Sequence, residues 1–205
     1  MKKIFLVTMI TLMVCALKAQ DVKLPTPNKK GGKPLMEALS ERKSNREFSE
    51  KELSNQQLSD LLWAANGISR EDGKKTAPSA RNMQQIDIYV FTAKGVYLYD
   101  AKENALLYKK EGDFRKEAAM QPFTHAAPVL LVFVANYKRM EGMPEDARDM
   151  YAATDCGNVS QNVYLYCSSA GLNTVALGSI HRDAIQKLLN YDGKAILGQP
   201  VGFPK

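Results

Sequence analysis

The stretch PVLLVFVA, residues 128–135, decides the fold class. It is continuously apolar and opens with a proline, so it predicts a central strand whose two faces are both covered. Other strand-like runs surround it, and the turn-like AKEN between the second and third of them indicates a meander. These runs are residues 86–91, 95–100, 104–109, 172–178 and 195–205.

Helical patterns alternate with these strands, which favours an α+β (mixed α/β) fold around one sheet. Ser54 and Gln57 form a capping box at the start of a helix that Gly67 ends. The longest helix is expected over residues 144–170, with an apolar seam, a polar stripe of Asp155, Asn158 and Asn162, and Gly171 as its C-cap. Shorter helices are expected at residues 35–42, 113–120 and around 185–189.

Residues 1–19 predict a secretory signal peptide. Two lysines precede an apolar run of about 14 residues, which is too short to span a bilayer, and Ala19 is a small residue at the expected cleavage point. Export to the periplasm is therefore expected, with no stable membrane insertion once the signal is removed. A lipoprotein anchored through Cys15 is disfavoured because Val14, which precedes it, is not a small residue.

The remaining chain is expected to form one domain. Residues 20–34, rich in Pro, Gly and Lys, indicate a linker or an arm before a domain over 35–205. Removal of the signal peptide lowers the net charge from +6 to +3, which gives no basis for nucleic-acid binding. Cys156 and Cys167 would lie about 16 Å apart along one helix, so no disulfide is expected between them.

Common catalytic templates are missing from the sequence. It contains no GxSxG, no GxxxxGK[ST] and no GxGxxG. His125 and His181 have no metal-ligand company, so no metal site is expected. Cys156 and Cys167 lie on the apolar seam, where a free cysteine behaves as a small hydrophobe rather than a nucleophile.

Three segments remain as candidates for a binding site. SERKSNREF, residues 40–48, places three cations within five residues, and these could face water, an acidic partner or a phosphate. TAPSARNMQQ, residues 76–85, offers short polar side chains to a ligand edge, or is an ordinary capped turn. TVALGSI, residues 174–180, brings a glycine that permits close approach to backbone N–H groups, or is a plain strand end.

Taken together, these segments resemble the nitroreductase family of FMN-dependent oxidoreductases. The resemblance rests on four segments in the family's order and covers about residues 35–205: RKSNREF (42–48), PSARNMQ (78–84), AGLNTVALGSI (170–180) and GQPVGFPK (198–205). It implies a nitroreductase-like, FMN-binding domain with a central mixed sheet flanked by helices. It also implies an intertwined homodimer with FMN at the subunit interface.

The resemblance further implies roles for individual residues. Arg42 and Ser44 would hold the FMN phosphate and ribityl chain with Lys43 close by, while Arg46 would reach the pyrimidine edge of the flavin. Four residues of one loop would approach the cofactor from the partner subunit: Pro78, Ser79, Asn82 and Gln84. The backbone at Leu177, Gly178 and Ser179 would pass beside flavin N5 and O4. Lys205 is a further candidate contact to the phosphate.

The function implied is a two-step flavoenzyme. A small-molecule donor would reduce FMN by hydride transfer to N5, and a flat electrophile such as a nitroaromatic or a quinone would take the electrons, with no catalytic side chain required. Export conflicts with the usual donor, NAD(P)H, which is a cytoplasmic metabolite. The alternatives are a substrate-oxidising flavin dehydrogenase, a flavin carrier or sensor without turnover, and an α+β domain whose cations form a solvated helix end.

Overall fold

The computed structural model describes residues 20–205, so the signal peptide expected at 1–19 lies outside the described residues. The described chain forms strands and helices in a mixed order. The strands are β1 (Val22–Lys23), β2 (Ile86–Phe91), β3 (Gly95–Asp100), β4 (Ala105–Glu111), β5 (Val129–Asn136), β6 (Asn173–Thr174) and β7 (Gly193–Gly202). The helices are α1 (Leu35–Glu41), α2 (Asn55–Asn66), α3 (Arg115–Ala118), α4 (Glu145–Ala170) and α5 (Arg182–Leu189), with 3-10 turns η1 (Ala80–Asn82), η2 (Pro122–His125) and η3 (Tyr137–Met140).

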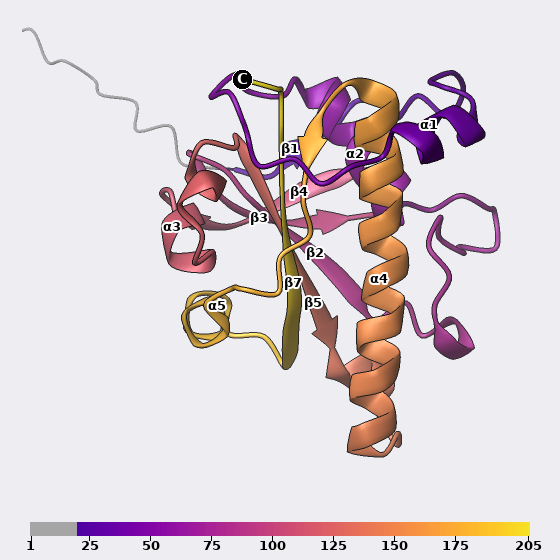
Figure 1. Ribbon diagram of the computed structural model, residues 1–205. Coiled ribbons are helices and arrows are strands. Elements are labelled where there is room, and N and C mark those ends of the chain that lie inside the picture. The colour runs from indigo at the N-terminus through magenta and orange to yellow at the C-terminus, as the bar shows by residue number, and fades with distance from the viewer. Residues whose placement is uncertain (1–19) are drawn as a thin grey trace, which may run out of the picture.

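One seven-stranded sheet in the order β1-β4-β3-β2-β5-β7-β6 forms the centre of the molecule. β2, β3 and β4 make the predicted meander, and β5 is paired on both sides, by β2 and by β7. Helices α2 and α4 cover one face of the sheet and α3 and α5 the other, as Figure 1 shows. The predicted α+β architecture is therefore confirmed.

The apolar run of β5 follows from this two-sided cover. Side chains alternate between the faces of a strand. Leu131 and Phe133 accordingly pack with the α2 and α4 side, whereas Leu130 and Val132 pack with α3 and α5. All four are completely buried. A strand with a polar face could not occupy this position.

The sheet differs in one respect from the mixed sheet implied by the family resemblance, because every strand pairing among residues 20–205 is antiparallel. The reason lies in the connection from β5 to β7. α4 carries the chain back along one face of the sheet, antiparallel to β5, and the segment after β6, which includes α5, returns along the other face (Figure 1). β7 therefore begins with Gly193 beside Asn136 at the end of β5 and runs in the opposite direction.

The two principal helices begin and end at the predicted signals. Ser54 and Gln57 exchange their reciprocal hydrogen bonds at the start of α2. α4 spans 26 residues and ends at Gly171, whose φ of +68° suits a residue without a Cβ. Cys156 and Cys167 lie on its core face as free thiols. Burial raises the pKa of the Cys156 thiol to about 12, so this thiol stays protonated and inert.

The strand expected over residues 172–178 is only partly formed. β6 ends at Thr174, and Leu177 rejoins β7 through an isolated bridge to Gly198. Between these points Val175 lies opposite Pro200 of β7, and a proline has no backbone N–H to continue the ladder. The backbone N–H of Ala176, next along the chain, bonds to the hydroxyl of Tyr164 on α4.

Residues 20–34, expected as a linker or an arm, lie packed along the domain. β1 pairs with β4, and Leu24 is buried in the core beneath α2. Asn28 bonds to Asp60 of α2, and the backbone N–H of Lys33 bonds to Ser169 of α4. Within residues 20–205, no helix combines the length and apolar character needed to cross a membrane.

Candidate functional site

The cationic segment begins where α1 ends. The backbone N–H of Arg42 caps the helix by donating to the carbonyl of Ala38 at 3.0 Å. The guanidinium carbon of Arg42 then lies 5.1 Å from the ring centre of Tyr164 on α4, within cation–π range. Ser44 follows, with its hydroxyl oxygen 2.9 Å from the hydroxyl oxygen of Tyr164. One tyrosine therefore contacts both residues.

Hydrogen bonds fix the extended chain that carries these side chains. The backbone N–H of Asn45 donates to the carbonyl of Thr174, and its side-chain amide donates to Asn173. The amide of Asn173 in turn donates to the carbonyl of Glu47 at 2.7 Å. Ser49 bonds to the carbonyl of Phe203 near the end of the chain. The segment 42–49 is thereby held against β6 and the C-terminal residues.

A hollow of about 490 Å³ lies beside this segment, a size within the range of ordinary ligand pockets. Arg42 and Lys43 line it together with Tyr164, and Pro204 brings the C-terminal segment to its wall, next to Lys205. Among residues 20–205, no carboxylate forms an ion pair with Arg42, Lys43, Arg46 or Lys205. The one carboxylate in the wall, Glu41, is paired with Lys33. The hollow therefore has cations free for an anion.

The segment 177–179 is joined to the cationic segment through Tyr164. Its hydroxyl accepts the backbone N–H of Ala176 at 2.8 Å, one residue before Leu177. Leu177 exchanges two backbone hydrogen bonds with Gly198 of β7. Gly178 and Ser179 are exposed, which leaves this turn open to a flat ligand. The structure thus brings two of the three candidate segments together.

The third segment, which contains residues 78–84, lies elsewhere in the folded structure. Arg81, Asn82 and Gln84 adopt positive φ angles of 50–54°, an unfavourable conformation for side chains with a Cβ. Several contacts hold it, among them two backbone N–H bonds: the Ser79 hydroxyl accepts the N–H of Gln84 at 2.9 Å, and the buried Asp155 carboxylate on α4 accepts the N–H of Ala80 at 2.9 Å. Strain that is held by its surroundings is typical of functional loops.

α4 separates this loop from the cationic segment. The loop is anchored to Asp155 and, more weakly, to Asn158, whose amide lies 3.4 Å from the carbonyl of Pro78. Asp155 precedes Tyr164 by nine residues, which corresponds to two and a half helical turns and about 13.5 Å of rise. The two residues therefore project from opposite sides of α4. A single chain does not bring Pro78, Ser79, Asn82 and Gln84 to the hollow beside Arg42.

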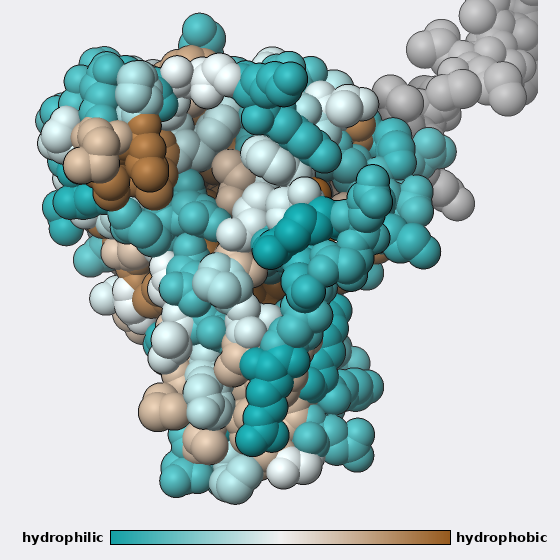
Figure 2. Space-filling model, turned by 90° about the vertical axis from the view of Figure 1, so that its right-hand side faces the viewer, coloured by the Kyte–Doolittle hydropathy of each residue, from teal (hydrophilic) through white to brown (hydrophobic). Residues whose placement is uncertain are grey.

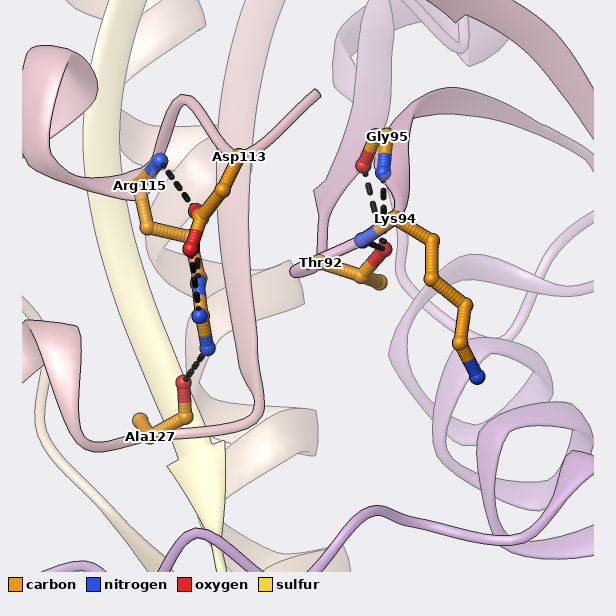
Figure 3. A network of polar contacts seen from close by, with 6 residues as sticks. All are labelled: Thr92, Lys94, Gly95, Asp113, Arg115 and Ala127. Atoms are coloured by element: carbon orange, nitrogen blue, oxygen red, sulfur yellow. Dashed lines mark hydrogen bonds and ion pairs between the residues drawn. The ribbon is translucent and has the colours of Figure 1, made fainter. Parts of the chain in front are cut away.

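A second hollow, of about 420 Å³, lies between the start of α2, the β2–β3 turn and the start of β5. Its cations are already paired. Figure 3 shows Arg115 between the Asp113 carboxylate, which it contacts through two nitrogens, and the carbonyl of Ala127. Lys94, also drawn there, pairs with Glu52 at 3.0 Å. Within residues 20–205, the Lys and Arg side chains that line this hollow are therefore already paired.

The sequence did not indicate the roles of two residues on α4, Tyr164 and Asp155. Tyr164 belongs to no motif, and only its position on the side of α4 opposite Asp155 could have indicated it. Asp155 was visible as part of a polar stripe, although that stripe does not indicate that it anchors residues 80 and 85.

Comparisons with known proteins agree with one another. The model of the nitroreductase family matches residues 39–203. A protein of Methanocaldococcus jannaschii named as a candidate nitroreductase is 33% identical over 178 residues, which are 82% of this chain and 90% of the relative.

Solved structures extend this agreement to three dimensions. The crystal structure of a candidate nitroreductase from Ralstonia eutropha superposes with a TM-score of 0.87 at 40% identity, covering 91% of this chain and 90% of that one. A candidate NAD(P)H:FMN oxidoreductase from Staphylococcus epidermidis has a TM-score of 0.64 at 14% identity over 87% of this chain and 91% of its own, which shows a shared fold.

Proposed function

The chain belongs to the nitroreductase family, and from this membership we propose that it is an FMN-dependent oxidoreductase that works as a homodimer. The observation that carries the proposal is that Arg42 and Lys43, which form no ion pair within residues 20–205, line the hollow that Tyr164 connects to residues 176–179.

The residues present fit the phosphate of FMN. A phosphate monoester carries nearly two negative charges, and a guanidinium forms charge-assisted, often bidentate, hydrogen bonds to it. Arg42 and Lys43 supply charge without first breaking an ion pair within the described part of the chain. Ser44 adds a hydroxyl on the same segment, and Lys205 follows a residue that lines the hollow.

Arg46 and the turn at 177–179 would serve the ring system. Arg46 would place a positive charge beside the pyrimidine edge, where negative charge develops when the ring is reduced. Leu177 is held to β7 by paired backbone bonds, so Gly178 and Ser179 can present backbone groups from a fixed turn. When bound, FMN would supply the redox chemistry at N5, between a small-molecule donor and a flat acceptor such as a nitroaromatic or quinone.

The position of the loop 78–84 supports the proposed homodimer. Because α4 keeps this loop away from its own hollow, Pro78, Ser79, Asn82 and Gln84 would reach the cofactor held by a second copy. The surface offers an apolar patch for such an association: Leu35, Met36 and Leu39 of α1 are 63%, 75% and 42% exposed. α1 lies on the side of the molecule that faces the viewer in Figure 2.

We also propose export after cleavage behind Ala19, as the N-terminal sequence predicts. The donor would then be something other than cytoplasmic NAD(P)H, or the enzyme would oxidise its substrate and pass the electrons onward. N-terminal sequencing of the protein from a periplasmic extract tests this step. A precursor that keeps its first residues in the cytoplasmic fraction contradicts it.

The decisive test is an FMN titration of the purified protein, followed by anaerobic stopped-flow mixing with NADH, NADPH and reduced quinones. We expect one FMN per chain and reduction of the bound flavin by at least one donor. A protein that binds no FMN refutes the cofactor assignment. Bound flavin that no donor reduces would instead favour the alternative class, a flavin carrier or sensor without turnover.

A further inference from the structure

Tyr164 has no assigned role, yet it contacts both ends of the proposed site. We propose that Tyr164 is a positioning residue that makes the Ser44 hydroxyl a hydrogen-bond donor toward an anionic group, so that it selects phosphorylated over unphosphorylated flavin. This inference rests on the proposed function and adds to it the part of the site that recognises the phosphate.

What each group can donate fixes the direction of the first of these two hydrogen bonds. The backbone N–H of Ala176 can only donate, and it does so to the Tyr164 hydroxyl oxygen at 2.8 Å. The Tyr164 hydroxyl has one proton and lies 2.9 Å from the oxygen of Ser44. If that proton is donated to Ser44, the proton of Ser44 is released to point at a ligand.

An anion in the hollow favours this direction. Arg42 and Lys43 line the hollow, so a phosphate drawn to them lies next to the segment that carries Ser44. A phosphate oxygen only accepts hydrogen bonds, and it therefore requires Ser44 to donate. Each bond in the row from Ala176 through Tyr164 to Ser44 then polarises the next, which strengthens the last one.

The ring of Tyr164 has a separate task. The guanidinium of Arg42 lies 5.1 Å from its centre, so the ring holds this cation in place through a cation–π contact. Tyr164→Phe removes the hydroxyl and keeps the ring, whereas Tyr164→Leu removes both. The two substitutions separate the two tasks.

Binding of FMN and of riboflavin, which lacks the phosphate, tests the proposal on the full chain. We expect Tyr164→Phe to weaken FMN binding by about 3- to 10-fold, the effect of one neutral hydrogen bond, and to leave riboflavin binding unchanged. Tyr164→Leu should weaken FMN binding further. Tyr166→Phe is the matched control, because its hydroxyl bonds to the carbonyl of Gln57 on the other flank of α4.

A double-mutant cycle with Ser44→Ala tests the coupling directly. If the Tyr164 hydroxyl acts through Ser44, the double variant Tyr164→Phe/Ser44→Ala should bind FMN about as weakly as Ser44→Ala alone. Losses that multiply, or a Tyr164→Phe variant that weakens FMN and riboflavin equally, would overturn the positioning role. A wild-type protein that binds neither flavin would overturn the proposed function itself, so the two failures are distinguishable.

Discussion

Asp155 on α4 accepts the backbone N–H of Ala80, 75 positions earlier in the sequence, at 2.9 Å. The same carboxylate oxygen accepts the side-chain amide of Gln85 at 2.5 Å. These two bonds bracket the residues with positive φ angles, so one buried carboxylate fixes both ends of the loop 80–85 on the helix.

Asp155→Ala is expected to lower the free energy of unfolding by about 2–3 kcal/mol, because it leaves two donors without their charged acceptor. Asp155→Asn should cost about 1 kcal/mol, since its amide oxygen can accept the same two bonds but without the full negative charge. Urea unfolding measures both. Thr154→Ala, an exposed neighbour on the same helix, is the control and should change stability little. Equal losses for Asp155→Ala and Thr154→Ala would contradict the anchoring role.

Arg42→Ala is expected to weaken FMN binding by about 1.5–3 kcal/mol, or about 10- to 150-fold, the range for a hydrogen bond to a charged group. Arg42→Lys should recover part of the loss, because it restores the charge but not the planar fork. Fluorescence titration at several salt concentrations measures the dissociation constants. Arg70→Ala, in the exposed loop after α2, should leave them unchanged. An unaltered dissociation constant for Arg42→Ala would remove this residue from the site.

In the proposed homodimer, Met36→Glu is expected to shift the equilibrium from dimer to monomer and to abolish stoichiometric FMN binding. The side chain is 75% exposed in the single chain, so a carboxylate there costs the monomer little, whereas it would be buried against a second copy. Light scattering during size-exclusion chromatography reads the mass. Lys102→Glu, which places a carboxylate in the turn between β3 and β4, should stay dimeric. A monomeric Met36→Glu variant that still binds one FMN per chain would argue against a shared site.

Asp113→Asn is expected to lower stability by about 1 kcal/mol at neutral pH, because it breaks the two-point contact with Arg115. The hydrogen bond from Arg115 holds the pKa of the Asp113 carboxyl below its usual value. A lowered folded-state pKa contributes stability above the unfolded pKa, near 3.9, that is lost as pH falls through the folded value. The difference between variant and wild type should therefore shrink below about pH 4.

Chemical unfolding at a series of pH values follows this effect. Asp72→Asn is the matched control, because the contact of Asp72 with Lys74 joins two exposed side chains and should matter much less. A stability difference for Asp113→Asn that persists undiminished at pH 3 would show that the ion pair is not its cause.

Local signals in the sequence were enough for much of the fold. The strands at 86–91 and 95–100 have the predicted boundaries, because their apolar side chains lie between Gly, Asp and turn residues. The helix from Ser54 to Gly67 was equally predictable, since the hydrogen bonds of its N-terminal cap join residues within a four-residue segment. The direction of β7 could not be predicted in this way, because it depends on the directions in which α4 and the segment after β6 run along the sheet.

The site was less predictable from the sequence, because it too depends on contacts between residues that are far apart along the chain. Arg42 and Ser44 belong to a compact motif, so the sequence indicated them. Tyr164 lies 120 positions from Ser44 and meets it only through the fold. The strand expected at 172–178 was misjudged for a similar reason, because the residue opposite Val175 is Pro200 of the later β7, which has no N–H to continue the ladder.

The short β1 has a consequence for how the protein behaves at high concentration. β1 pairs with β4 only at Leu106 and Ala105, so within residues 20–205 the rest of the outer side of β4 has no neighbouring strand. That stretch ends in Lys109, Lys110 and Glu111, whose charges oppose the stacking of a foreign strand. A brief cover followed by charged side chains is a common defence against edge-to-edge aggregation, and it disfavours fibril-like growth along the sheet.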